Sequence, residues 1–282
     1  MRFSSGRAAP STIRAIAVSG ISAILPPMQH PENHTKARIN PFGAVFFFCC
    51  LLSVFSARPE PAAAFQAVAT AAPPAASAQS VDSYTIAQRG DGYRVSISYP
   101  QVGNPVADAE LGIWAREQAA AFTDSVKRIP TPPAVPYELF ITYETLKASS
   151  RVISVVFFIN TAMGGAHPEP GMATFVYDRR DGRRLSYSDI FANQDGMPKA
   201  FSAFCRTALT EQLGDRVMDE MLEAGTGPDM ANFDLFALVG NGVRVYFPPY
   251  QAAPYSEGYL NVTVPLDELA DFKPHRAFWD KP

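Results

Sequence analysis

One stretch near the middle of the chain, residues 160–191, restricts the path of the backbone more than any other. Its sequence is NTAMGGAHPEPGMATFVYDRRDGRRLSYSDIF. A strand ends near its start, and Gly164 and Gly165 then permit backbone angles that other residues resist. His167 follows, and Pro168 and Pro170 after it stiffen the loop. Alternating β-branched and aromatic residues over 172–178 predict a second strand, and an Asp-Gly pair after it is typical of a hairpin turn.

The flanking sequence predicts further strands and two long helices. The pattern predicts strands at about 83–88, 93–99, 137–146, 151–160, 185–187, 233–239, 243–247 and 259–264, and helices at about 106–127, 197–213 and 265–269. The apolar run 152–159 is almost continuous, which indicates a strand with both faces covered. We therefore expect an α+β fold, with antiparallel β-hairpins or a sheet and helices packed on one side.

The N-terminal segment has the features of a targeting signal. Lys36 and Arg38 form a basic region, residues 42–57 are mostly apolar, and three alanines end at Ala64. A run of 16 residues is short for a membrane span, which needs about 20. We expect an exported protein, periplasmic or extracellular, with cleavage near Ala64. The alternative is an uncleaved anchor, and the start codon can be Met1 or Met28.

These features divide the chain into three parts. Residues 1–64 are an N-terminal extension and signal peptide, residues 65–80 an Ala/Pro-rich linker, and residues 81–282 an α+β module with a sub-boundary near 188–196. Two of the three cysteines leave with the signal, so Cys205 remains as a small buried hydrophobic residue and no disulfide can form within the mature chain.

Three motifs carry a resemblance to a known family. They are GGAHP, YDRRDGRRLSYSDIF and GVRVYFPPYQAAPYSEGYLNVTVPLDEL, in this order. Over about 80–269 the chain resembles the extracytoplasmic module shared by RsiV-type anti-sigma factors, which sense lysozyme, and PdaC-type peptidoglycan deacetylases, where it lies outside the catalytic domain. The resemblance implies an exported module, and it implies that loop residues bind a lysozyme. From it we carry over Pro254 and Tyr255, which match an APY motif.

Two loops contain the candidate site residues. In the Pro/Tyr-rich loop 248–255, Tyr250 and Tyr255 have the large amphipathic rings that anchor interfaces, and the prolines pre-order the backbone. The alternative is that both rings pack back on their own hairpin. We add Gly164, Gly165 and His167 of the GGAHP loop to the candidate binding surface.

His167 has two possible roles. It is either a general base oriented by Glu169 or Asp178, or a side chain that pins the tight turn by bonding to loop carbonyls. The sequence favours the structural role.

Composition excludes several classes of function. The sequence after residue 64 has two histidines and one cysteine, too few for a zinc site, and contains none of the familiar catalytic or phosphate-binding motifs. We therefore expect no metal and no cofactor. Residues 1–64 have a net charge of +4 and the remainder −7, which argues against nucleic acid and favours a basic partner.

The residues favour a binding module over an enzyme. The expected partner is a lysozyme, another basic protein or peptidoglycan, with membrane contact only if the signal segment stays uncleaved. The alternative is an envelope enzyme acting on peptidoglycan or another glycan through His167 and nearby acids. A third hypothesis, an anchored anti-sigma sensor, needs a helical cytoplasmic segment, and residues 1–35 are rich in helix breakers.

Overall fold

The computed structural model describes residues 82–131 and 133–279. The predicted signal segment and the linker 65–80 lie outside the described residues, so the cleavage near Ala64 stays a prediction. Residues 188–196, the predicted sub-boundary, contain the end of α2 and the approach to α3. The described chain forms two sheets with helices, which confirms the predicted α+β class.

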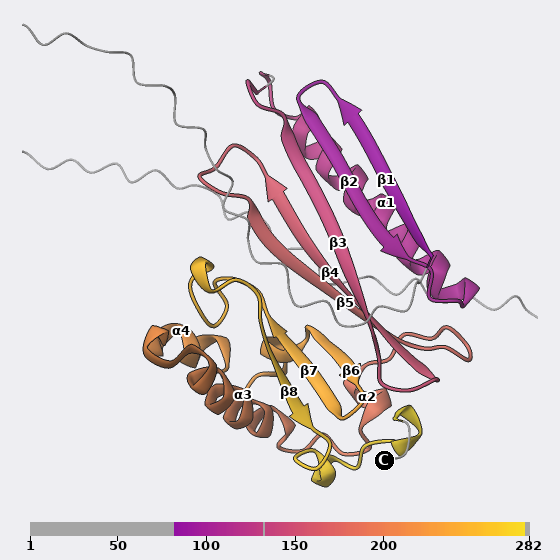
Figure 1. Cartoon of the computed structure of the whole chain (residues 1–282), viewed down its shortest axis with the longest axis vertical. Helices are drawn as coiled ribbons and strands as arrows, with labels where there is room; N and C mark the ends of the chain where they lie inside the picture. Colours follow the sequence, from indigo (N-terminus) through magenta and orange to yellow (C-terminus); the bar gives the residue numbers. More distant parts are fainter. Residues whose placement is uncertain (1–81, 132, 280–282) are drawn as a thin grey trace, which may run out of the picture. The chain divides into compact units, whose positions relative to one another are not determined.

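A five-stranded sheet is built from the first half of the described chain. Its strands are β1 (Ser83–Gly90), β2 (Tyr93–Pro100), β3 (Tyr137–Lys147), β4 (Val152–Ala162) and β5 (Glu169–Asp178), in the order β1-β2-β3-β4-β5 (Figure 1). Three of the four pairings are antiparallel, as expected, but β2 and β3 run parallel. The sequence analysis missed this pairing. It arises because the long helix α1 connects β2 to β3 and returns the chain to the same end of the sheet.

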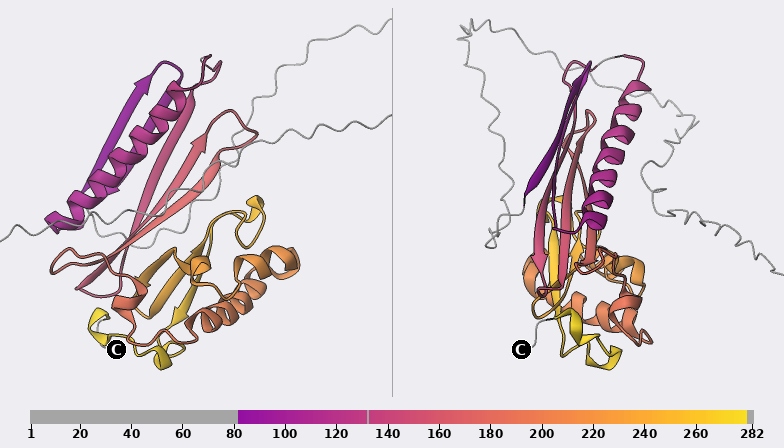
Figure 2. Two further views of the ribbon diagram at one scale, coloured as in Figure 1. Left: turned by 180° about the vertical axis from the view of Figure 1, so that it is seen from behind. Right: turned by 90° about the vertical axis from the view of Figure 1, so that its right-hand side faces the viewer.

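Helix α1 (Pro105–Lys127) covers one face of this sheet (Figure 2). Asn104 caps its start by accepting a hydrogen bond from the Val106 amide at 2.9 Å, and Pro105 occupies the first turn, where no donor is needed. Trp114 stacks on Phe157 of β4 with ring centroids 4.2 Å apart. The helix therefore buries its apolar face, including Leu111, Ala115 and Phe122, against the sheet.

A three-stranded sheet packs against the other face of β4. Its strands are β6 (Phe236–Val239), β7 (Gly242–Phe247) and β8 (Leu260–Pro265), all antiparallel. Ala237 and Tyr246 on one of its faces pack with Val156 of β4. Its other face packs on helix α3 (Met197–Leu213) in a separate core. Coverage from both sides explains the continuous apolar run in β4.

Side-chain hydroxyls of the large sheet hold the edge strand β6. The Leu238 amide donates to Ser154 Oγ at 2.9 Å, and the Phe236 amide donates to Thr174 Oγ1 at 3.2 Å. Ser154 and Thr174 lie on neighbouring strands and are both buried. Two amides that an edge strand would otherwise leave unpaired are therefore satisfied across the sheet–sheet contact.

The second half of the chain differs from expectation at several element ends. Short helices occur at α2 (Tyr187–Ile190) and α4 (Asp219–Gly225), and 3-10 turns at η1 (Gly214–Arg216), η2 (Met230–Phe233), η3 (Tyr255–Glu257), η4 (Ala270–Phe272) and η5 (Arg276–Phe278). The predicted strand at 233–239 begins only at Phe236, because η2 precedes it. The predicted helix 265–269 is wrong: Pro265 pairs with Gly242 as the last residue of β8.

Cys205 is fully buried on α3, as predicted, and burial raises the pKa of its thiol to about 12. The predicted return strand 185–187 is reduced to one bridge between Tyr177 and Arg184, because α2 starts at Tyr187.

A buried ion pair joins the far end of β5 to the start of β4. The Asp178 carboxylate, 2% exposed, accepts hydrogen bonds from Arg151 Nε at 2.9 Å and Nη2 at 2.5 Å. Burial alone would raise the pKa of Asp178, but bonds from Arg151 and from the Arg180 amide outweigh it and lower the pKa to about 2.

Replacing Asp178 with Asn should lower the free energy of unfolding at neutral pH by about 3 kcal/mol, because Arg151 keeps a charge without its partner. A lowered pKa gives stability that is present above the unfolded value of 3.8 and lost as the pH falls toward about 2. The difference in unfolding free energy between wild type and variant should therefore shrink by about 2 kcal/mol across that pH range. Urea titrations test this, with the exposed Asp267→Asn as control. A gap independent of pH would contradict the assignment.

Candidate functional site

Two loops from different sheets meet at one end of the five-stranded sheet. The GGAHP loop, residues 164–168, joins β4 to β5. The Pro/Tyr loop, residues 248–255, lies between β7 and β8. Although His167 and Tyr250 are 83 residues apart, His167 Nε2 and the Tyr250 hydroxyl lie 3.1 Å apart.

The three rings of this contact form one group, which we call the aromatic cluster: His167, Tyr250 and Tyr255. The imidazole stacks on the Tyr255 ring with centroids 4.1 Å apart and planes inclined by 22°. The Tyr250 and Tyr255 rings lie 5.8 Å apart. Tyr250 is 53% exposed and His167 is also exposed, so the cluster is open to solvent.

The backbone of the Pro/Tyr loop is tightly constrained. Tyr250 adopts φ +72°, a left-handed conformation that is costly for a residue with a side chain. Its amide donates to the Ala253 carbonyl at 2.9 Å, closing the turn. Gln251 Nε2 donates to the carbonyls of Gly225 and Asn232, which ties the loop to the body of the module. These bonds hold the Tyr250 ring outward at a fixed position.

Tyr259, which lies between the Pro/Tyr loop and β8, ties the β7–β8 connection to the large sheet. Its hydroxyl donates to the carbonyls of Ile159 and Gly171 at 3.2 and 3.4 Å, and its ring packs edge-on against Phe158 at 5.2 Å. Burial raises the pKa of Tyr259 to about 12, and the nearby Tyr255 adds to this effect. The sequence analysis missed Tyr259 and Gln251, because a tyrosine at the start of a strand and a glutamine in a turn give no distinctive pattern.

The structure brings together three of the six predicted site residues directly. Pro254 immediately precedes η3, where Tyr255 begins the turn. Gly164 has φ +86° and lies beside the Tyr137 ring, so with Gly165 it shapes the GGAHP loop without adding a functional group. The alternative that both tyrosines pack only on their own hairpin is not what the structure shows, since His167 lies against each.

His167 also fills the structural role that the sequence favoured. Its Nδ1 lies 3.0 Å from the Pro168 carbonyl, so both ring nitrogens have a partner that is not a carboxylate. Asp178 lies at the opposite end of β5 and is bound by Arg151. The general-base hypothesis therefore lacks the carboxylate that would orient the ring.

Two further observations concern metals and membranes. Among residues 82–131 and 133–279, the structure gathers no group of three or more His, Cys, Asp or Glu side chains that could hold a metal ion. In the same part of the chain, every helix is too short or too polar to cross a membrane.

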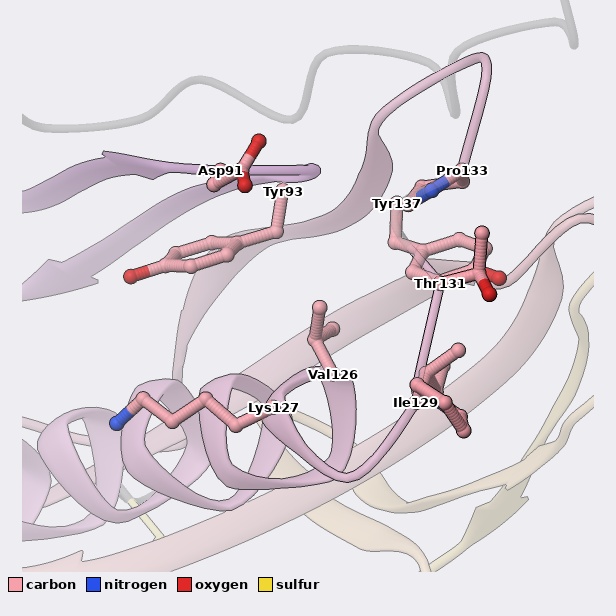
Figure 3. A pocket seen from close by; sticks show the side chains of 9 residues that line it. Asp91, Tyr93, Val126, Lys127, Ile129, Thr131, Pro133 and Tyr137 are labelled. Carbon is pink, nitrogen blue, oxygen red and sulfur yellow. The ribbon is translucent and has the colours of Figure 1, made fainter.

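A pocket of about 190 Å³ lies near the same end of the sheet, between the end of α1, the β1–β2 turn and the start of β3 (Figure 3). The rings of Tyr93 and Tyr137 line it on the strand side and Val126 on the helix side. Its cationic side chain, Lys127, is bound to Asp124 at 3.3 Å. Because Lys127 is paired with Asp124, which does not line the pocket, the described lining residues offer a ligand no unpaired cation. We therefore place the candidate site at the aromatic cluster.

The fold and the cluster define a class: an α+β module that presents an aromatic surface built from two loops. Residues 188–267 match the family model described as "Protein of unknown function (DUF3298)". A solved structure of a DUF3298 family protein from Pseudomonas aeruginosa superposes with a TM-score of 0.54 at 16% identity, over 72% of this chain and 99% of that one. This likeness concerns the fold alone.

Two curated relatives are more similar in sequence. The peptidoglycan-N-acetylmuramic acid deacetylase PdaC of Bacillus subtilis is 25% identical over 192 residues, 68% of this chain and 41% of PdaC. The immunogenic protein MPT64 of Mycobacterium tuberculosis is 28% identical over 143 residues, 49% of this chain and 61% of MPT64. The chain spans less than two thirds of either relative. The match of residues 188–267 to the DUF3298 model and the similarity to PdaC confirm the resemblance to PdaC-type proteins.

Because His167 and Tyr250 are exposed and Tyr255 is only half-buried, the aromatic cluster should contribute little to folding. We expect His167→Ala and Tyr255→Ala each to change the free energy of unfolding by less than about 1 kcal/mol. Tyr259→Ala should cost about 3 kcal/mol, because it removes a half-buried ring and two hydrogen bonds. Urea denaturation followed by circular dichroism measures all three. A loss above about 2 kcal/mol for His167→Ala would show that the cluster is mainly a structural pin.

Proposed function

We propose that this chain is an exported binding module of the bacterial cell envelope that captures a basic protein, a lysozyme being the first candidate, through the aromatic cluster. One observation carries the proposal: two loops far apart in sequence converge to hold three rings in contact and open to solvent. Single exposed rings are common on protein surfaces, but contiguous exposed apolar groups mark interaction sites.

The physical properties of the cluster suit a protein interface. Tyrosine buries a large area with few rotatable bonds and keeps a polar tip, which is why it is enriched among residues that dominate binding energy. The bonds that fix Tyr250 and Gln251 pre-order the loop, so less conformational entropy is lost when a partner binds.

The charge distribution supports a basic partner. Residues 82–187 contain eleven acidic and eleven basic side chains, whereas residues 188–267 contain eleven acidic and only four basic ones. The negative charge of the module therefore belongs to the part that supplies the Pro/Tyr loop. Such a field raises the association rate of a basic partner and weakens with salt. The resemblance to lysozyme-sensing anti-sigma factors makes lysozyme the first protein to test.

Peptidoglycan is the second candidate partner. The printed name of PdaC assigns that relative to peptidoglycan, and an exposed stack of rings also suits the apolar faces of sugars. Both candidates place the module outside the cytoplasm, in agreement with the predicted signal segment.

Lysozyme binding is tested by titrating the full chain against several lysozymes while their activity is recorded. We expect submicromolar binding with inhibition, and at least tenfold weaker binding by Tyr255→Ala. Tyr84→Ala, which removes a ring of similar exposure (49%) from the edge strand β1, should bind as tightly as wild type. If every lysozyme fails to bind, or both variants lose affinity equally, the lysozyme proposal is wrong.

The His167→Ala variant distinguishes the binding module from the alternative of an envelope enzyme. His167→Ala should abolish turnover of peptidoglycan fragments if the ring is a general base. A binding module should show no His167-dependent turnover at all.

A further inference from the structure

The bonds around His167 determine where the protons of the aromatic cluster lie. A carbonyl oxygen only accepts hydrogen bonds, so the 3.0 Å contact with the Pro168 carbonyl requires a proton on Nδ1. In the neutral ring Nε2 is then bare. The Tyr250 hydroxyl, 3.1 Å away, must therefore donate its proton to Nε2.

This arrangement sets the polarity of the His167–Tyr250 pair. The Tyr250 proton points at His167, so the hydroxyl oxygen offers only lone pairs to a partner. The Nδ1 proton is bound within the loop. The rings present π faces, which are electron-rich. The pair thus accepts hydrogen bonds at Tyr250 Oη and the faces attract positive charge, while the Tyr255 hydroxyl can donate or accept.

We infer that the group that seats on the aromatic cluster is a cationic side chain of the partner, an arginine in preference to a lysine. Its N–H groups donate to Tyr250 Oη, and its planar guanidinium lies against the exposed rings. This inference rests on the proposed function and names the chemistry of the partner at that site. The acidic excess in residues 188–267 favours the same charge.

The test uses N-acetyl-L-arginine amide as the probe and its neutral isostere N-acetyl-L-citrulline amide as the matched control. Binding to the full chain is followed by NMR shifts of the His167 ring. At about pH 8 we expect saturable binding of the arginine probe at least fivefold tighter than of the citrulline probe. Tyr250→Phe, which removes only the acceptor oxygen, should weaken arginine binding at least threefold.

Tyr84→Phe is the control variant, because Tyr84 is 49% exposed and its hydroxyl also accepts a hydrogen bond, from Gln101. Tyr84→Phe should bind the arginine probe as tightly as wild type.

Equal binding of both probes, or full binding by Tyr250→Phe, would overturn the inference. An equal loss of arginine binding in Tyr84→Phe would do the same. If a lysozyme binds through Tyr255 while the arginine probe fails, this inference falls and the proposed function stands. If the probe binds as expected and every lysozyme fails, the partner is another basic protein.

Discussion

The docking of the edge strand β6 onto the large sheet is the constraint on which the rest of the structure depends. Two buried hydroxyls, Ser154 Oγ and Thr174 Oγ1, accept the Leu238 and Phe236 amides. An unpaired buried amide costs about 1–3 kcal/mol. The bonds therefore set both the position and the register of β6, and through β6–β7–β8 pairing they set the rest of the small sheet.

That docking brings the two loops of the candidate site together. The GGAHP loop belongs to the β4–β5 hairpin, and the Pro/Tyr loop to the connection between β7 and β8. Neither loop alone contains the aromatic cluster, because His167 comes from one and both tyrosines from the other. Tyr259 adds a second tie, with its hydroxyl on carbonyls of β4 and β5. The surface is thus a product of tertiary packing.

The sequence predicted local features well and spatial relations poorly. Helices α1 and α3, the β3–β4 hairpin and buried Cys205 follow from periodicity and turn chemistry. The continuous apolar run of β4 indicated burial on both faces, but not which elements cover it. The sequence analysis did not predict the parallel β2–β3 pairing or the hydrogen bonds of Ser154. Both join segments far apart in the chain, and neither leaves a local sequence pattern. His167, Tyr250 and Tyr255 were chosen as residue types in two loops, whereas the contacts of His167 with the two tyrosines join residues at least 83 positions apart in sequence.

The most direct test of this account asks whether sheet docking assembles the aromatic cluster. It compares NMR spectra of the wild-type full chain and a Ser154→Ala, Thr174→Val variant, with Ser96→Ala on the half-exposed face of β2 as control. We expect ring-current-shifted His167 protons with nuclear Overhauser contacts to Tyr255 in wild type and control, and loss of both in the double variant while the β3–β4 hairpin signals persist. Unchanged His167–Tyr255 contacts in the double variant would show that the loops assemble the cluster without the docked strand, which would contradict the account.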